Sequence, residues 1–173
     1  SSISGMFTNT TTSPIDITFT IIPRGPSVTY CYGSSIIATV TVQPKPYVDF
    51  TPNNANQCLG GNNFIFTNNS YVSGSTLAYN WTFGDGGRSN SSSSTVAYGY
   101  IASGNFNVKL LATSSFGCKD SVSKTAFVHP MPAVGFSIND ADQCKTGNSF
   151  IFTNSSSISV GTLNYRWTFG DGG

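Results

Sequence analysis

The chain has 173 residues, of which only 9% are charged, and its eight Lys and Arg residues nearly balance seven Asp residues. This near-neutral charge excludes the basic surface typical of nucleic-acid-binding proteins and the charged tails of disordered chains. No apolar run reaches the ~20 residues of a membrane span, whereas a 13% aromatic content is enough to build a core.

The first segment, residues 1–43, predicts β-strands. Apolar and polar residues alternate over residues 15–21 and again over 37–42, the period of a half-buried strand, and helical periodicity is absent from the whole chain. Cys31, the strand after it and the following Pro-Lys-Pro parallel the arrangement around Cys118. We interpret residues 1–43 as the C-terminal half of a preceding β-module.

A Pro-x-Pro pair occurs twice, at residues 44–46 and 130–132. Proline fixes φ and removes a hydrogen-bond donor, so each pair predicts a short, stiff spacer between modules. These boundaries predict a complete module at residues 44–129, called here the first copy. They leave the N-terminal half of another module at residues 130–173, called the second copy.

The two copies are repeats. Aligned without a gap at a shift of 86 residues, residues 44–87 and 130–173 agree at 27 of 44 positions, which is the signature of a tandem array. Strands are expected in the first copy at 48–50, 64–68 and 79–83. The corresponding strands of the second copy are expected at 134–136, 150–154 and 165–169.

The most regular of these strands alternates Tyr79, Trp81 and Phe83, which places three rings on one face. It ends at Gly84-Asp85-Gly86, because glycine accepts positive φ and Asp bonds its own backbone in turns. The motif returns as Trp167, Phe169, Gly170, Asp171 and Gly172. A core strand with its turn explains the pattern. The alternation favours the core over sugar stacking by the two Trp side chains.

The sequence Trp-Thr-Phe-Gly-Asp-Gly at residues 81–86 resembles the Trp-Asp-Phe-Gly-Asp-Gly motif of PKD domains, which are immunoglobulin-like modules. The family's later pattern is matched by Tyr98-Gly99-Tyr100, by residues 104–110 and by Gly117. Thr82 replaces the family's Asp and Tyr98 its His, and we expect both changes to weaken polar contacts. The resemblance covers residues 44–173 and implies an all-β fold of tandem immunoglobulin-like antiparallel β-sandwiches.

The rest of the first copy predicts a strand at residues 106–110 and a closing strand at 121–128. Tyr100 stands where a tyrosine corner is expected, a Tyr whose hydroxyl binds a crossing loop. The core is expected to contain Trp81, Phe66, Phe106, Val108 and Leu110.

Four cysteines allow three pairings. Cys58 stands early and Cys118 late in the first copy, so the repeat predicts a Cys58–Cys118 disulfide. Cys144 repeats the early position and Cys31 the late one, and each is expected to have its partner beyond this stretch. The alternative is four reduced thiols in a cytosolic protein, since disulfides follow oxidising compartments. Zinc is disfavoured because no Cys-x-x-Cys is present.

Catalytic residues are not predicted. Nucleophilic catalysis needs a base near its Ser or Cys, and the lone His129 lies beside a predicted spacer. Asp85 and Asp171 belong to turns, while Asp49 and Asp120 have no neighbouring carboxylate. We therefore expect no enzymatic activity in this stretch.

No cofactor is expected, with calcium as the alternative. Some PKD modules bind calcium, which prefers oxygen ligands. Residues 139–142 (Asn-Asp-Ala-Asp) offer two carboxylates, but residues 53–56 of the first copy offer none. We therefore interpret this segment as a solvated loop.

Two functions remain. The first is the stalk of a large secreted bacterial cell-surface adhesin, because the early Gln-Cys, the late Gly-Cys-Lys-Asp and the Pro-x-Pro pairs resemble the PKD arrays of Bacteroidota surface proteins. Those arrays include gliding-motility adhesins exported by type IX secretion. The second is a spacer in a secreted protease or polysaccharide-degrading enzyme.

The adhesin interpretation implies neighbouring repeats as partners, an extracellular location and a surface or glycan ligand that this stretch does not name. It implies no nucleic acid and no membrane insertion. We expect the half-modules to belong to a longer array, and strand exchange between molecules is the less favoured alternative.

Overall fold

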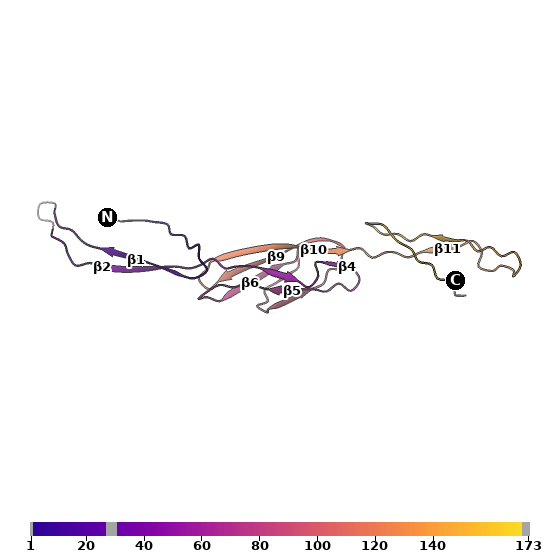
Figure 1. Cartoon of the computed structure of the whole chain (residues 1–173), viewed down its shortest axis with the longest axis horizontal. Coiled ribbons are helices and arrows are strands. Elements are labelled where there is room, and N and C mark those ends of the chain that lie inside the picture. Colours follow the sequence, from indigo (N-terminus) through magenta and orange to yellow (C-terminus); the bar gives the residue numbers. More distant parts are fainter. Residues whose placement is uncertain (1, 27–30, 171–173) are drawn as a thin grey trace.

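The computed structural model describes residues 2–26 and 31–170, and in these ranges it contains β-strands and no helix. The predicted all-β class is therefore confirmed. The molecule is elongated (Figure 1). A hairpin lies at one end, a two-sheet sandwich in the middle and a smaller strand pair at the other end.

The sandwich is built from two sheets of the first copy. The larger has the strand order β4-β10-β9-β6-β7 and the smaller β3-β5-β8. Their strands are β3 (Phe50–Pro52), β4 (Asn56–Cys58), β5 (Phe64–Asn68), β6 (Leu77–Thr82), β7 (Arg88–Ser89), β8 (Thr95–Tyr98), β9 (Gly104–Ser114) and β10 (Lys119–His129). All pairings are antiparallel except the short one between β4 and β10, which is parallel.

Alternating residues of both sheets meet in one core, because successive side chains of a strand point to opposite faces. Trp81, Phe66, Val108 and Leu110 are buried there, as expected. Phe106 is only partly buried, and its ring stacks on Tyr100 at 4.1 Å. The remaining buried apolar residues are Val48, Phe50, Phe64, Phe83, Val96, Tyr100, Ala112, Ala126 and Val128.

The N-terminal segment forms a hairpin of β1 (Ile15–Ile21) and β2 (Ile36–Val42), close to the predicted ranges. The register pairs Ile17 with Val40 and Phe19 with Ala38, so the alternating apolar residues of both strands share one face. In the second copy, β11 (Phe136–Ile138) pairs with β12 (Phe152–Asn154).

The strand predicted at residues 165–169 does not form, so this prediction is wrong. The equivalent β6 of the first copy has a partner on each side, β9 and β7. No described strand offers residues 165–169 such a partner, and a strand without a partner cannot satisfy its backbone hydrogen bonds.

The first Pro-x-Pro pair packs into the sandwich. Pro44 and Pro46 are buried, and Lys45 between them forms an ion pair with Asp120 at 3.0 Å. Pro132 of the second pair is exposed. The first pair is therefore packed against the body of the sandwich.

Candidate functional site

The turn that follows β6 is closed by its own backbone and by one carboxylate. The Phe83 amide donates to the Gly87 carbonyl at 3.1 Å, and the Gly87 amide donates to Asp85 Oδ1 at 2.9 Å. Gly84 and Gly86 have φ of 88° and 101°, a region that side chains other than glycine rarely adopt. Asp85 therefore serves as an acceptor that shapes the turn.

Two tyrosines hold this turn against the sandwich. The Tyr98 hydroxyl donates to both Asp85 oxygens, at 3.0 and 2.9 Å, and its ring stacks on Phe83 with centroids 3.8 Å apart. The buried Tyr100 hydroxyl donates to the Phe83 carbonyl at 2.8 Å. Tyr98 thus keeps a polar contact with the turn at the position where the family has His.

Burial raises the pKa of both tyrosines above the ordinary 10.0. For Tyr98 the hydrogen bond to Asp85 and the charge of Asp85 raise the pKa further. For Tyr100 the charges of Asp85 and Tyr98 add to burial. Both hydroxyls are therefore protonated donors at neutral pH, which suits a structural role for the turn.

Asn62 is a structural residue that the sequence analysis missed. Its side-chain amide donates to the carbonyls of Leu59 and Tyr100 at 2.8 and 2.9 Å, and its oxygen accepts from the Tyr100 amide at 2.7 Å. The sequence did contain a signal for this role, because Asn62 recurs in the second copy as Asn148. Asn148 donates to the Lys145 carbonyl at 2.9 Å.

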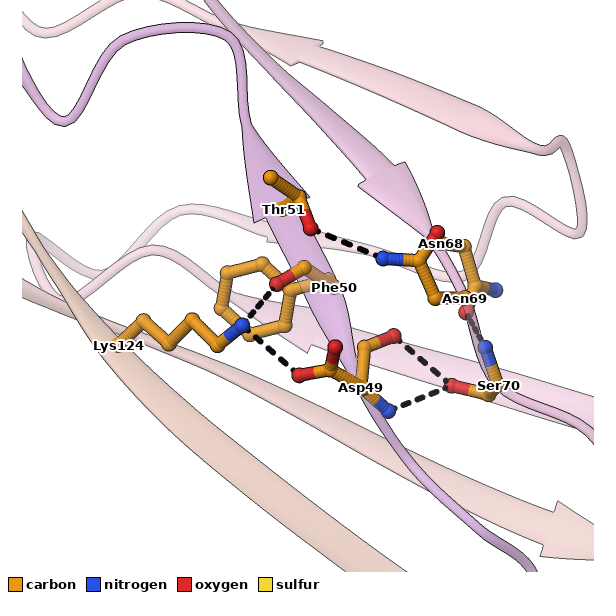
Figure 2. A network of polar contacts seen from close by, with 7 residues as sticks. All are labelled: Asp49, Phe50, Thr51, Asn68, Asn69, Ser70 and Lys124. Atoms are coloured by element: carbon orange, nitrogen blue, oxygen red, sulfur yellow. Dashed lines mark hydrogen bonds and ion pairs between the residues drawn. The ribbon is translucent and has the colours of Figure 1, made fainter.

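A second polar network joins the two sheets at one edge (Figure 2). Lys124 on β10 forms an ion pair with Asp49 at 2.8 Å and donates to the Phe50 carbonyl. The Asp49 amide donates to the Ser70 hydroxyl, and this hydroxyl donates to the Asp49 carbonyl, both at 3.2 Å. The Asn69 side-chain amide donates to the Thr51 hydroxyl. The hydrogen bond and charge of Lys124 lower the pKa of the Asp49 carboxyl below its ordinary 3.8.

We expect the Asp49–Lys124 ion pair to make stability depend on acid pH. A carboxyl with a lowered pKa in the folded state stabilises above its unfolded pKa, and this stabilisation is lost as pH falls through the folded value. Below about pH 4, the native chain should lose the ~0.2–1 kcal/mol of a partly exposed ion pair. Asp49→Asn should remove this loss. Urea denaturation at pH 3 and pH 7 measures it, and an unchanged pH dependence in Asp49→Asn would contradict the assignment.

The predicted Cys58–Cys118 disulfide is contradicted by the structure. Cys58 lies opposite His129, the last residue of β10, whereas Cys118 directly precedes Lys119, its first residue. A strand of this length separates the two cysteines by roughly 35 Å at ~3.3 Å per residue. A disulfide requires Cα atoms within about 7 Å. The two cysteines are far apart because β4 pairs in parallel with the far end of β10. Cys58, Cys118 and Cys144 carry free thiols.

Oxidation of the native chain is therefore expected to yield no Cys58–Cys118 cross-link within one molecule. Cys58 and Cys144 are exposed and should react with maleimide at similar rates, and both faster than the half-buried Cys118. Peptide mapping by mass spectrometry measures both results. Recovery of an intramolecular 58–118 peptide from folded protein would contradict this geometry.

His129 and the loop aspartates of the second copy make local polar contacts. His129 ends β10, with its Nε2 atom 3.3 Å from the Asn56 side-chain oxygen. In the exposed loop of the second copy, Asp140 accepts the Asp142 amide at 3.1 Å. Within residues 2–26 and 31–170, no three His, Cys, Asp or Glu side chains gather as a metal-ion site. Asp171 and Gly172 lie outside the described residues.

The motif tryptophans differ sharply between the copies. Trp81 is completely buried, so it cannot stack on a sugar. Trp167 and Phe169 of the second copy are 42% and 48% exposed, and Gly170 has open space beside it. The same sequence motif is thus buried in the core of the first copy and partly exposed on an apolar face of the second copy.

A model of the PKD domain family matches residues 43–130, just over half of the 173-residue chain. The chain belongs to the PKD domain family. PKD domains are non-catalytic structural modules that occur in extracellular or secreted proteins. The Asp85 turn with its two tyrosines is therefore part of the frame of a PKD module. No described element is a helix able to cross a membrane.

Solved structures of PKD domains are similar to this chain. The PKD1 domain of Vibrio anguillarum Epp is 23% identical, with a TM-score of 0.43 over 50% of this chain and 96% of that one. The PKD1 domain from the Vibrio cholerae metalloprotease PrtV is 24% identical, with a TM-score of 0.42 over 49% and 98%. A structure described for carbohydrate-binding modules of the β-sandwich superfamily is 28% identical, with a TM-score of 0.50 over 61% and 43%. No curated protein matches the chain.

Proposed function

We propose that this chain is a repeat segment of an extended stalk that carries a secreted bacterial adhesin away from the cell surface. The repetition of backbone contacts at a shift of 86 residues supports this proposal. The bridge of Tyr47 with Tyr71 recurs as Ala133 with Ser157. The pairing of Phe50 with Asn68 likewise recurs in β11 and β12. The same local pairings thus recur once per sequence repeat, which fits a tandem array of modules.

In this proposal residues 44–129 are one complete PKD module, and residues 1–43 and 130–173 are halves of its neighbours. At ~3.3 Å per residue, strands of about eight residues plus loops give a module roughly 35–40 Å long. The strand pairs on both sides of the sandwich lie along the same long axis (Figure 1), which fits modules joined end to end.

The stalk itself performs no catalysis in this proposal. Its partners are the neighbouring repeats of the same chain, and a surface or glycan ligand is bound elsewhere. Attachment, gliding motility and type IX secretion are the processes that the resemblance to Bacteroidota arrays adds to this proposal.

A spacer in a secreted hydrolase is the second candidate. The observation favouring it is the similarity, at 28% identity and a TM-score of 0.50, to the structure described for carbohydrate-binding modules. This chain spans only 43% of that one, so the similarity concerns part of that structure. In this case a polysaccharide-degrading or proteolytic domain accompanies the module.

The test is an in-frame deletion of residues 44–129 from the protein in its native cells. A stalk predicts reduced attachment to a surface, and replacement by an unrelated β-sandwich of equal length should restore it. The matched control is a replacement with a flexible Gly/Ser linker, which should not restore attachment. A cytosolic location, or loss of hydrolytic turnover with attachment unchanged, would contradict the stalk.

A further inference from the structure

The sandwich of residues 44–129 binds its first segment to its last strand, β10. Lys45 forms an ion pair with Asp120 at 3.0 Å, and Asp49 forms an ion pair with Lys124 at 2.8 Å. Both pairs join residues that are 75 positions apart in the chain. The first segment of the sandwich therefore runs parallel to the first half of β10.

Lys124 makes a second contact with the same segment. Its ammonium group donates to the Phe50 carbonyl and lies 5.3 Å from the centroid of the Phe50 ring. Figure 2 shows Lys124 reaching from β10 to Asp49 and Phe50. A hydrogen bond from a charged donor is stronger than one between neutral groups. One side chain thus joins the two strands through both a charge and a hydrogen bond.

Backbone hydrogen bonds continue the connection at the other end of β10. The Phe127 amide donates to the Ala55 carbonyl at 2.7 Å, and the Leu59 amide donates to the His129 carbonyl at 2.8 Å. Between these bonds β4 pairs with β10 in parallel. We call the two ion pairs, the contact of Lys124 with the Phe50 carbonyl and this parallel pairing the clamp.

The charged part of the clamp is specific to the first copy. Met131 of the second copy stands at the position of Lys45, and Gly135 stands at the position of Asp49. β11 nevertheless pairs with β12 as β3 pairs with β5. The two ion pairs are therefore not needed to form these strands, and they add a connection that the fold does not require.

Tension along the chain loads every link of the clamp at the same time. A pull from the preceding residues acts at Pro44, and a pull from the following residues acts at His129. Because the first segment and β10 run parallel, these two pulls slide one along the other. The links of the clamp then break together, whereas a pull that peels two strands apart breaks their bonds one after another.

We propose that the clamp is the site that resists tension in this module and sets how long the sandwich stays folded under load. The inference rests on the proposed function, in which the module is part of a stalk that transmits tension to a surface. Unfolding under force is governed by the unfolding rate. The clamp therefore acts on this rate, and the aromatic core supplies most of the stability at equilibrium.

Single-molecule pulling of the full chain from its two ends tests the proposal at constant load. Unfolding of the sandwich is recognised by the release of roughly 260 Å of chain, from 86 residues at ~3.5 Å each less a folded length of ~40 Å. Lys124→Met keeps the apolar stem and removes the charge. It should make this event roughly tenfold faster, because a charged hydrogen bond and an ion pair are lost. Lys45→Met, which introduces the residue of the second copy, should accelerate it about two- to fivefold.

Two control variants separate the clamp from general stability. Lys109→Met removes the same charge from β9, outside the clamp, and should leave the lifetime under load unchanged. Gly86→Ala alters the turn between β6 and β7, where φ is 101°, and should lower the urea midpoint more than Lys45→Met does. It should change the lifetime under load less than twofold, because this turn is still folded when the clamp breaks.

Urea denaturation of each variant shows that it is folded before it is pulled. Equal acceleration by Lys109→Met, unchanged lifetimes in both clamp variants, or lifetimes that follow the urea midpoints would each overturn the proposal. The pulling measurement uses the isolated chain, whereas the stalk function is tested by attachment of cells. A failure of one is therefore distinguishable from a failure of the other.

Discussion

Replacing Trp81 with Ala is expected to lower the free energy of unfolding of the sandwich by ~3–5 kcal/mol. The Trp81 ring is fully buried and lies 5.2 Å from Phe50 and 6.1 Å from Phe66. Its Nε1 atom has no hydrogen-bond partner among the described residues, so the loss comes from packing and from the cavity left behind. A loss of this size is a large part of the ~5–15 kcal/mol that stabilises a typical domain.

Trp167→Ala is the matched control, because Trp167 occupies the same position of the repeat but is 42% exposed. In dilute solution its replacement should cost less than about 1 kcal/mol, since little buried area is removed. Urea denaturation followed by circular dichroism measures both variants. Similar losses for the two would contradict the assignment of residues 44–129 as the finished core.

Replacing Gly84 with Ala is expected to destabilise the sandwich by roughly 2–5 kcal/mol. A non-glycine residue at φ of 88° costs about 1–2 kcal/mol. A Cβ atom at Gly84 would also lie 2.7 Å from the Asn107 backbone nitrogen and 3.1 Å from its oxygen. Relieving such a contact requires backbone movement, which costs about 1–3 kcal/mol more.

Gly86→Ala separates these two contributions. Gly86 has a φ of 101°, but a Cβ atom there would meet no atom within 4 Å. Only the conformational cost of about 1–2 kcal/mol should appear. Thermal denaturation of both variants provides the comparison, and an equal loss of stability at the two glycines would mean that the close approach to Asn107 has no energetic weight.

Local alternation carried most of the fold prediction. The ranges expected for β1 and β5 are those observed, because a half-buried strand needs only a period of two in its own residues. The prediction of a strand at residues 165–169 was wrong because alternation alone is not sufficient. These residues alternate perfectly, but strand formation also needs a neighbouring strand as a partner. The alternating pattern therefore predicted which segments prefer the strand conformation. The presence of a pairing partner decided which of these segments form a strand.

The polar contacts of the site were less predictable. Tyr98 and Asp85 are 13 residues apart, and Lys124 and Asp49 are 75 residues apart, so their contacts depend on how the sheets stack. The cysteine pairing failed for a related reason. The early and late positions of two cysteines in a repeat do not show which end of a neighbouring strand each cysteine lies beside. Cys58 meets the end of β10, and Cys118 lies at its beginning.

The sequence by itself determined the all-β class, the 86-residue repeat and the aromatic strand with its glycine turn. Each of these depends on residues close together in the chain, or on direct comparison of two segments. Only the tertiary structure decided which apolar faces are covered. Burial is a relation between segments, and the β9–β10 hairpin covers the rings of the first copy, while the same rings of the second copy line an open groove.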